Sequence, residues 1–133
     1  MSSNYKFILI DDVPVNNLLA RITIESVFPD ASIIEFTEGE AGFAFIEQLG
    51  SKANVETRYN LFLDIYMPVM DGWDFMEKFN QLDSSIKNNV KVYALSSSIS
   101  RIDEDRAKLD SNIAAYLIKP FTQEILKSLD LIQ

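Results

Sequence analysis

Short apolar runs alternate along the chain with longer stretches in which apolar residues recur at three- and four-residue spacing. A short run is typical of a strand covered on both faces, and the longer spacing is typical of an amphipathic helix. The predicted strands are 5–10, 32–36, 61–63, 91–95 and 114–118, and the predicted helices are 14–28, 39–49, 72–79, 100–110 and 122–132. Polar segments at 50–58 and 83–89 are predicted as surface loops.

The first and last predicted helices have the clearest apolar stripes. Their predicted inward faces are Val15, Leu18, Leu19, Ile22 in the first and Ile125, Leu126, Leu129, Ile132 in the last. Pro14 suits the first turn of a helix and Thr122 suits a cap. The helix at 100–110 has only a weak apolar face, which indicates low local stability.

Strands and helices alternate five times over, which predicts an α/β fold. We expect a single doubly wound five-stranded parallel sheet with helices on both faces. The length of 133 residues suits one core, so residues 1–133 are predicted to form a single domain. Right-handed crossovers would place the carboxyl end of every strand at the same edge of the sheet.

Several polar residues follow directly after the predicted strands. Asp11-Asp12 follows the first strand, Asp64 the central one, Ser96 the fourth and Lys119 the fifth. Taken singly, each has an ordinary structural explanation: Asp12 as a helix cap, Ser96 as a turn residue, Lys119 as a solvated lysine. Because ligands of such folds bind outside the carboxyl ends of the strands, their common edge favours a functional site.

Composition excludes several classes of function. The net charge of −8 argues against nucleic acid or an anionic membrane as a partner. The chain has no cysteine and no histidine, so thiolate metal sites, imidazole bases and an internal phosphohistidine are excluded. It has no signal peptide and no apolar run long enough to span a membrane, so we expect a cytoplasmic protein.

The acidic residues suggest a particular chemistry. Three carboxylates in one pocket repel one another unless a cation or a proton intervenes. An all-oxygen ligand set selects a hard cation, most simply Mg²⁺, for which Mn²⁺ could substitute. A carboxylate beside such a cation can attack phosphorus and form an aspartyl phosphate. Lys119 could neutralise the phosphoryl oxygens and the Ser96 hydroxyl could donate to one of them.

At this point the chain resembles a CheY-like response-regulator receiver domain over nearly its whole length. The motifs that carry the resemblance are Asp11-Asp12, Asp64-x-x-Met67-Pro68-x-Met70-Asp71-Gly72, Ala94-Leu95-Ser96-Ser97 and Tyr116-x-x-Lys119-Pro120-Phe121. No output domain follows the last predicted helix, so the sequence resembles a stand-alone receiver.

The resemblance implies a role for each acidic residue. Asp64 would be the phospho-acceptor, and it would bind Mg²⁺ together with Asp12. Asp11 would act largely through metal-bound water, and the backbone carbonyl of Tyr66 would complete the protein's ligands. The domain would catalyse its own phosphorylation and dephosphorylation and would not be a turnover enzyme on a small substrate.

The resemblance also implies how the signal is read. Ser96 and Lys119 would bind the phosphoryl group, Ser96 and Tyr116 would act as the switch pair, and the peptide bond before Pro120 would be cis. The phosphoryl donor would be a histidine kinase or a histidine phosphotransfer protein. A downstream protein would bind the face formed by the fourth helix, the fifth strand and the fifth helix.

Three other functions are weighed against this one. A haloacid-dehalogenase-type phosphatase would need an Asp two residues after Asp64, where this chain has Tyr66. A flavin-binding flavodoxin would need a phosphate-binding loop where this chain has Asp11-Asp12. A receiver that no longer accepts phosphate would not need the intact acidic and lysine positions.

The resemblance raises one further question, about Tyr66 and Ser98. Both flank the phosphoryl group in this family. Tyr66 is bulky and Ser98 is small, so we expect a long-lived phosphoryl group if the Tyr66 ring leans across it. The alternative is that the ring points to solvent.

Overall fold

The computed structural model describes residues 5–51 and 57–133; residues 52–56, within the segment predicted as the loop 50–58, lie outside the described residues. A five-stranded parallel sheet has the order β2-β1-β3-β4-β5. The strands are β1 Lys6–Ile10, β2 Ser32–Phe36, β3 Tyr59–Asp64, β4 Val90–Ser96 and β5 Ile113–Ile118. The helices are α1 Pro14–Val27, α2 Gly39–Gln48, α3 Gly72–Phe79, α4 Ser84–Lys87, α5 Arg101–Leu109 and α6 Gln123–Ser128, and a 3-10 turn spans Leu49–Ser51. The predicted fold class is confirmed.

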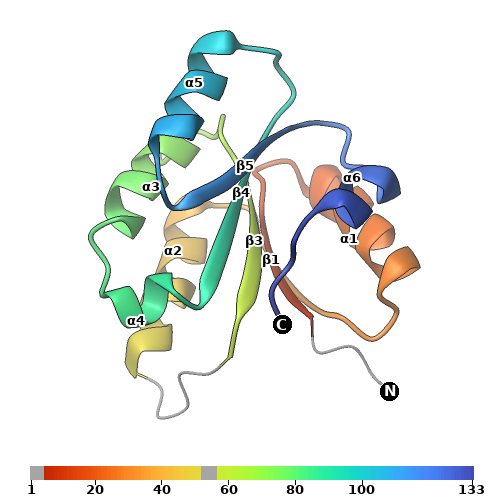
Figure 1. Cartoon of the computed structure of the whole chain (residues 1–133), viewed down its shortest axis with the longest axis horizontal. Helices are drawn as coiled ribbons and strands as arrows, with labels where there is room; N and C mark the ends of the chain where they lie inside the picture. Colours follow the sequence, from red (N-terminus) through yellow and green to blue (C-terminus); the bar gives the residue numbers. More distant parts are fainter. Residues whose placement is uncertain (1–4, 52–56) are drawn as a thin grey trace.

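Helices cover both faces of the sheet (Figure 1). α1 and α6 lie on one face, and α2, α3 and α5 lie on the other. Side chains alternate along the inner strands, so β1 sends Ile8 to the α2–α3 side and Phe7 to the α1–α6 side. On the α1–α6 side Phe62 of β3 stacks on Tyr93 of β4, with ring centroids 5.3 Å apart. No described helix is both long and apolar enough to cross a membrane.

The rotation of α1 about its axis is opposite to the prediction. The residues that face the sheet are Asn17, Ala20 and Ile24. The predicted inward stripe is half exposed, at 53% for Val15, 49% for Leu18, 56% for Leu19 and 53% for Ile22. The physical reason is Asn17, whose side-chain amide donates to the carbonyls of Asp11 (3.2 Å) and Phe36 (3.1 Å) at the ends of β1 and β2. These bonds satisfy strand-end carbonyls, and they leave the most apolar stripe of the helix in solvent.

The last helix is shorter than the predicted 122–132. Thr122 caps it as predicted, but α6 ends at Ser128 and the chain continues in an extended form from Leu129. Leu126 is fully buried, and Leu129 packs beside the same core from outside the helix. The tail leaves the helix because β3 offers it a partner: Asn60 bonds to both backbone groups of Ile132.

The polar segment 83–89 is not a plain loop. It contains the four-residue helix α4, which Asp83 caps: the Asp83 carboxylate accepts from the Ser85 N–H (3.2 Å). Ile86 anchors this helix in the core. A single helical turn is too short to produce the repeated apolar spacing that identifies longer helices. The predicted helix at 100–110 is confirmed as α5, and Ser100 caps it.

Candidate functional site

Three carboxylates meet at the carboxyl edge of the sheet. Asp11 and Asp12 follow β1 and Asp64 ends β3, and oxygens of the three side chains lie within 4.8 Å of one another. Asp11 and Asp64 are almost fully buried, at 4% and 5% exposed. The parallel strands therefore bring together acids that are more than fifty residues apart, as the sequence predicted.

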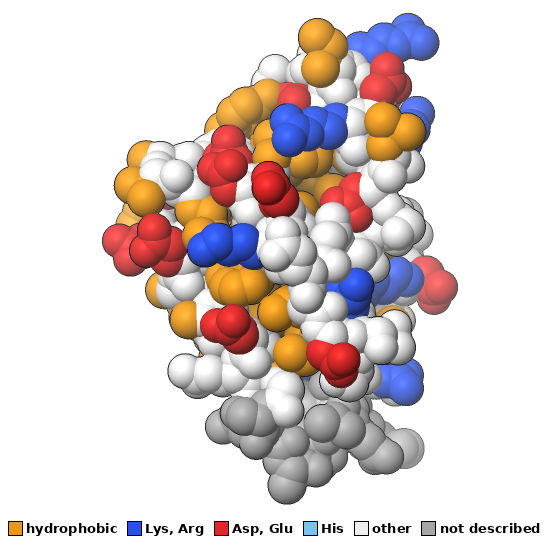
Figure 2. Space-filling view, turned by 90° about the vertical axis from the view of Figure 1, so that its left-hand side faces the viewer, with side chains coloured by type: hydrophobic (Ala, Val, Ile, Leu, Met, Phe, Trp, Pro, Cys, Tyr) orange, Lys and Arg blue, Asp and Glu red, His pale blue; other side chains and the backbone are white. Residues whose placement is uncertain are grey.

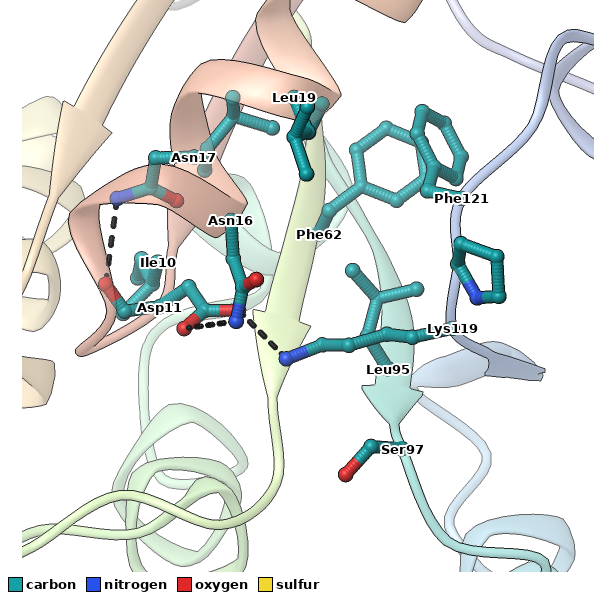
Figure 3. A pocket seen from close by; sticks show the side chains of 13 residues that line it. Ile10, Asp11, Asn16, Asn17, Leu19, Phe62, Leu95, Ser97, Lys119 and Phe121 are labelled. Carbon is teal, nitrogen blue, oxygen red and sulfur yellow. Dashed lines mark hydrogen bonds and ion pairs between the residues drawn. The ribbon is translucent and has the colours of Figure 1, made fainter.

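Lys119 is a paired lysine and not a solvated one. Its ammonium nitrogen lies 2.6 Å from Asp11 Oδ2 (Figure 3). The same nitrogen lies 3.3 Å from Asp64 Oδ1. Burial alone would lower the pKa of the Lys119 ammonium, but the hydrogen bond to Asp11 and the charge of Asp64 outweigh burial and raise it. The backbone N–H of Lys119 donates to the Ser96 carbonyl (2.8 Å), and the Lys119–Pro120 peptide bond is cis.

Asp11 also supports the start of α1. Its Oδ1 accepts from the Val13 N–H (3.0 Å) and from the Asn16 side-chain amide (3.3 Å), the latter visible in Figure 3. The sequence suggested Asp12 for this structural role, whereas the structure shows Asp11 in it. Asp11 thus has donors on one oxygen and Lys119 on the other, which explains how a buried carboxylate is accommodated here.

Asp64 is the residue of the cluster whose pKa is raised by its surroundings. Burial and the charge of Asp11 raise the pKa of Asp64 to about 6, and Lys119 only partly offsets them. One lysine cannot neutralise three carboxylates, so the site favours a proton or a further cation. The donors are all oxygens on short side chains, and this set fits a small hard cation such as Mg²⁺ better than Zn²⁺.

Gly72 shapes the backbone beside Asp64. A Cβ at this position would lie 2.7 Å from the Ile65 Cα and 2.9 Å from the Asp64 carbonyl oxygen. Only glycine therefore lets the start of α3 approach the end of β3 this closely. Asp71 completes the turn, because it caps α3 in a reciprocal pair with Asp74.

Ser96 and Tyr116 meet at the connection from β4 to α5. Ser96 is fully buried, and its hydroxyl exchanges hydrogen bonds with the backbone of Ser98: it accepts from the N–H at 3.0 Å and donates to the carbonyl at 3.3 Å. The Tyr116 hydroxyl donates to the same Ser98 carbonyl (3.2 Å). Both residues of the predicted switch pair are thus hydrogen-bonded to the backbone of Ser98.

The Tyr66 side chain is bonded to α5. Its side chain is 52% exposed, and its hydroxyl donates to the carboxylate of Asp103 on α5. Asp103 was not predicted as a site residue. An acid in the first turn of a capped helix is common, so its sequence position alone gives no functional signal.

A cavity of about 360 Å³ opens beside Asp11 and Lys119, between α1 and the segment after β5. Figure 3 shows Leu19, Phe62, Leu95 and Phe121 around it. Its walls are mostly apolar, and Asp11 and Lys119 are the charged residues that line it. The exposed stripe of α1 contributes Leu19 to this cavity, so the apolar surface is continuous with the site.

Comparisons with known proteins agree with this geometry. The family model of the response regulator receiver domain matches residues 7–129. A response regulator receiver protein from Dyadobacter fermentans superposes with a TM-score of 0.82 at 18% identity, covering 93% of each chain. A two-component response regulator from Cytophaga hutchinsonii has a TM-score of 0.82 at 27% identity, covering 92% of this chain and 91% of that one.

A third similar structure is the chemotaxis protein CheY4 of Vibrio cholerae, with a TM-score of 0.70 at 19% identity and 93% of each chain covered. At this identity the likeness concerns the fold alone. The family model matches almost the whole chain and includes every residue of the acidic cluster, Ser96 and Lys119. The chain therefore belongs to the response regulator receiver domain family of two-component signalling.

Proposed function

We propose that Asp64 accepts a phosphoryl group from a histidine of another protein. The observation that carries the proposal is the position of Asp64: buried at the end of the central strand, beside Asp11 and Asp12, and 3.3 Å from the Lys119 ammonium. Receiver domains are signalling domains, and phosphorylation of an acidic residue is general to the family. In the transfer, an Asp64 oxygen bonds to phosphorus, the N–P bond breaks, and the electron pair stays on the imidazole nitrogen.

The neighbouring acids would hold the cation. Asp12 and Asp64 would bind Mg²⁺ directly, Asp11 largely through water, and the Tyr66 backbone carbonyl would add a further oxygen. Bound Mg²⁺ would supply positive charge for the phosphoryl oxygens. It would also keep Asp64 ionised at neutral pH, where burial and Asp11 otherwise raise its pKa to about 6.

Lys119 and Ser96 would bind the phosphoryl group itself. Lys119 already reaches Asp64 and is held by Asp11, so its ammonium needs little movement to pair with a phosphoryl oxygen. Ser96 needs more movement, because its hydroxyl is engaged with Ser98. We propose that Ser96 leaves Ser98 when the phosphoryl group arrives, and that Tyr116, which holds the same carbonyl, responds.

A phosphohistidine donor would lie outside these 133 residues, which contain no histidine. We propose that the exposed stripe of α1 meets that donor, a histidine kinase or a histidine phosphotransfer protein. Leu18, Leu19 and Ile22 are about half exposed, and the stripe borders the cavity beside Asp11 and Lys119. An apolar surface next to the reacting group suits a protein that must bring its histidine to Asp64.

The downstream partner would use the β5 edge of the sheet, over α5, β5 and α6. Ile99, Ile102 and Leu109 are 89%, 80% and 87% exposed there. Figure 2 shows the α5 part of this surface, at the top of the view, where apolar side chains lie among charged ones. Such a mixed surface suits a transient protein partner better than an obligate one.

The test is incubation with Mg²⁺ and acetyl phosphate, followed by intact mass. We expect one phosphoryl group on the wild type and on Asp30→Asn, an exposed acid that controls for the loss of a charge. We expect none on Asp64→Asn. A wild type that gains no phosphoryl group would instead be a receiver that binds partners without phosphorylation.

A further inference from the structure

One hydrogen bond links the connection after β3 to the switch side of the molecule. Tyr66 lies two residues after Asp64, and its hydroxyl donates to the carboxylate of Asp103 in the first turn of α5. Asp103 is 7% exposed, although Arg101, Ile102, Glu104 and Asp105 around it are exposed. A buried carboxylate needs a donor, and the Tyr66 hydroxyl supplies one.

The same Asp103 also holds the end of the loop that contains Ser98. Its backbone N–H donates to the Ser100 hydroxyl (3.2 Å), which caps α5. At the other end of the loop, Ser98 is bonded to the Ser96 and Tyr116 hydroxyls. The loop from Ser96 to Ser100 is therefore fixed at both ends, and Tyr66 supports the α5 end.

We propose that Asp103 is a positioning residue for the phosphoryl site and that its bond to Tyr66 favours the resting arrangement of the 96–100 loop. This inference rests on the proposed function of Asp64. Ser96 must leave Ser98 to reach a phosphoryl oxygen, and that movement pulls on the first turn of α5. The Tyr66–Asp103 bond resists the pull because it ties this turn to the β3–α3 connection.

Linkage then requires a reciprocal effect. If the bond stabilises the resting arrangement, phosphoryl binding weakens the bond, and loss of the bond strengthens phosphoryl binding by the same factor. The contact is made by one hydroxyl and one carboxylate, so removing either partner should have the same effect. Removing both should add little to removing one, because they act through a single bond.

The first measurement is the affinity for beryllofluoride in the presence of Mg²⁺. It is determined by tryptophan fluorescence or by calorimetry. We expect Tyr66→Phe and Asp103→Ala each to bind it roughly three- to tenfold more tightly, as for the loss of one hydrogen bond of ordinary net strength. The double variant should match the single ones. Asp103→Asn keeps an acceptor for the hydroxyl and should lie closer to the wild type.

The matched control is Glu104→Ala. Glu104 is in the same turn and carries the same charge, but it is exposed and its ion pair is with Lys108. It should bind beryllofluoride as the wild type does. Tyr66→Phe changes no charge and keeps the ring, so an effect shared by Tyr66→Phe and Asp103→Ala is not a change in the local field.

The second measurement is amide exchange over residues 97–103 without ligand. We expect faster exchange in Tyr66→Phe and Asp103→Ala and unchanged exchange in Glu104→Ala. Equal affinity and equal exchange in wild type and both variants would overturn the inference. A wild type that binds no beryllofluoride would instead overturn the proposed function, and with it the coupling of this bond to the phosphoryl site.

Discussion

β3 carries a buried polar side chain near each of its ends, and the surroundings of the two differ sharply. Asn60, near the start, is fully buried and uncharged, and its amide is completely bonded: it donates to the Ile132 carbonyl (2.8 Å) and the Lys6 carbonyl (3.4 Å) and accepts from the Ile132 N–H (3.0 Å). Asp64, at the other end, is almost as buried but lies among two further carboxylates with one shared lysine.

The start of β3, at Asn60, contributes to stability, whereas its end, at Asp64, contributes to the proposed function. The Asn60 end satisfies every polar atom and fixes the C-terminal tail, which Tyr93 also holds through the Asp130 carbonyl (3.3 Å). The Asp64 end keeps three carboxylates together beside one lysine. A buried polar group with full partners stabilises the fold, whereas an incompletely compensated one stores free energy that a ligand can release.

The largest effect is expected at Asn60. Asn60→Ala removes the bonds to Ile132 and leaves a gap beside β1, so the free energy of unfolding should fall by about 2–3 kcal/mol. Urea unfolding measures it. Asn80→Ala is the control: this amide donates to Asp110 (2.9 Å) and accepts from Asn112 (2.6 Å), but it is exposed, so its loss should cost under about 1 kcal/mol. Equal losses would remove the distinction between the two ends of β3.

Substitution of Asp64 is expected to raise the free energy of unfolding in metal-free buffer, whereas substitution of Asn60 lowers it. Burial and Asp11 raise its pKa from 3.8 to about 6 in the folded state. The carboxyl group therefore contributes stability below pH 4, and that contribution is lost as pH rises through about 6. The change amounts to about 3 kcal/mol at most, since one pKa unit corresponds to about 1.4 kcal/mol. Above pH 6, Asp64→Asn should be more stable than the wild type.

Thermal unfolding in chelator across pH 4–8 checks this directly. The wild type should lose stability relative to Asp64→Asn as pH rises through that range, and Mg²⁺ should narrow the gap at pH 8. A wild type that is more stable than Asp64→Asn in chelator at pH 8 would show that Lys119 fully compensates the cluster.

A smaller gain in the free energy of unfolding is expected from substitution of Val69, in the connection after Asp64. Val69 has a φ of 68° and is 91% exposed. A β-branched residue rarely adopts this left-handed conformation, so the site end of β3 also holds backbone strain. Val69→Asn should stabilise the fold by about 0.5–1 kcal/mol in urea unfolding. Val69→Ala removes the β-branching but lacks the polar side chain that favours this conformation, so it should gain less. A loss on Val69→Asn would mean that the valine side chain is itself stabilising.

The sheet and the acidic site were predictable because they depend on local patterns and on one rule. Apolar runs marked the strands, and parallel strands place their carboxyl ends together, so Asp11, Asp64 and Lys119 had to converge. Neither step needs the details of packing. The motifs around these positions were also long enough to identify the family before any contact was known.

The rotation of α1 and the path of the tail were not predictable in this way. An apolar stripe normally faces the core, but the Asn17 bonds to the ends of β1 and β2 turn the stripe of α1 outward. The tail after Ser128 continues a helical pattern, yet Asn60 draws Ile132 to β3. Each outcome depends on a different asparagine and on a partner on another strand or in the tail. The bond between Tyr66 and Asp103 likewise joins two residues that are far apart in sequence.

The central claim is that Asp64, and neither of its acidic neighbours, accepts the phosphoryl group. The direct measurement is treatment with Mg²⁺ and acetyl phosphate, reduction of the acyl phosphate with borohydride, proteolysis and peptide mass spectrometry. The account predicts that the reduced residue is at position 64 and that residues 11 and 12 remain aspartate. Reduction at Asp11 or Asp12 in the wild type, or reduction that persists elsewhere in Asp64→Asn at the wild-type level, would contradict it.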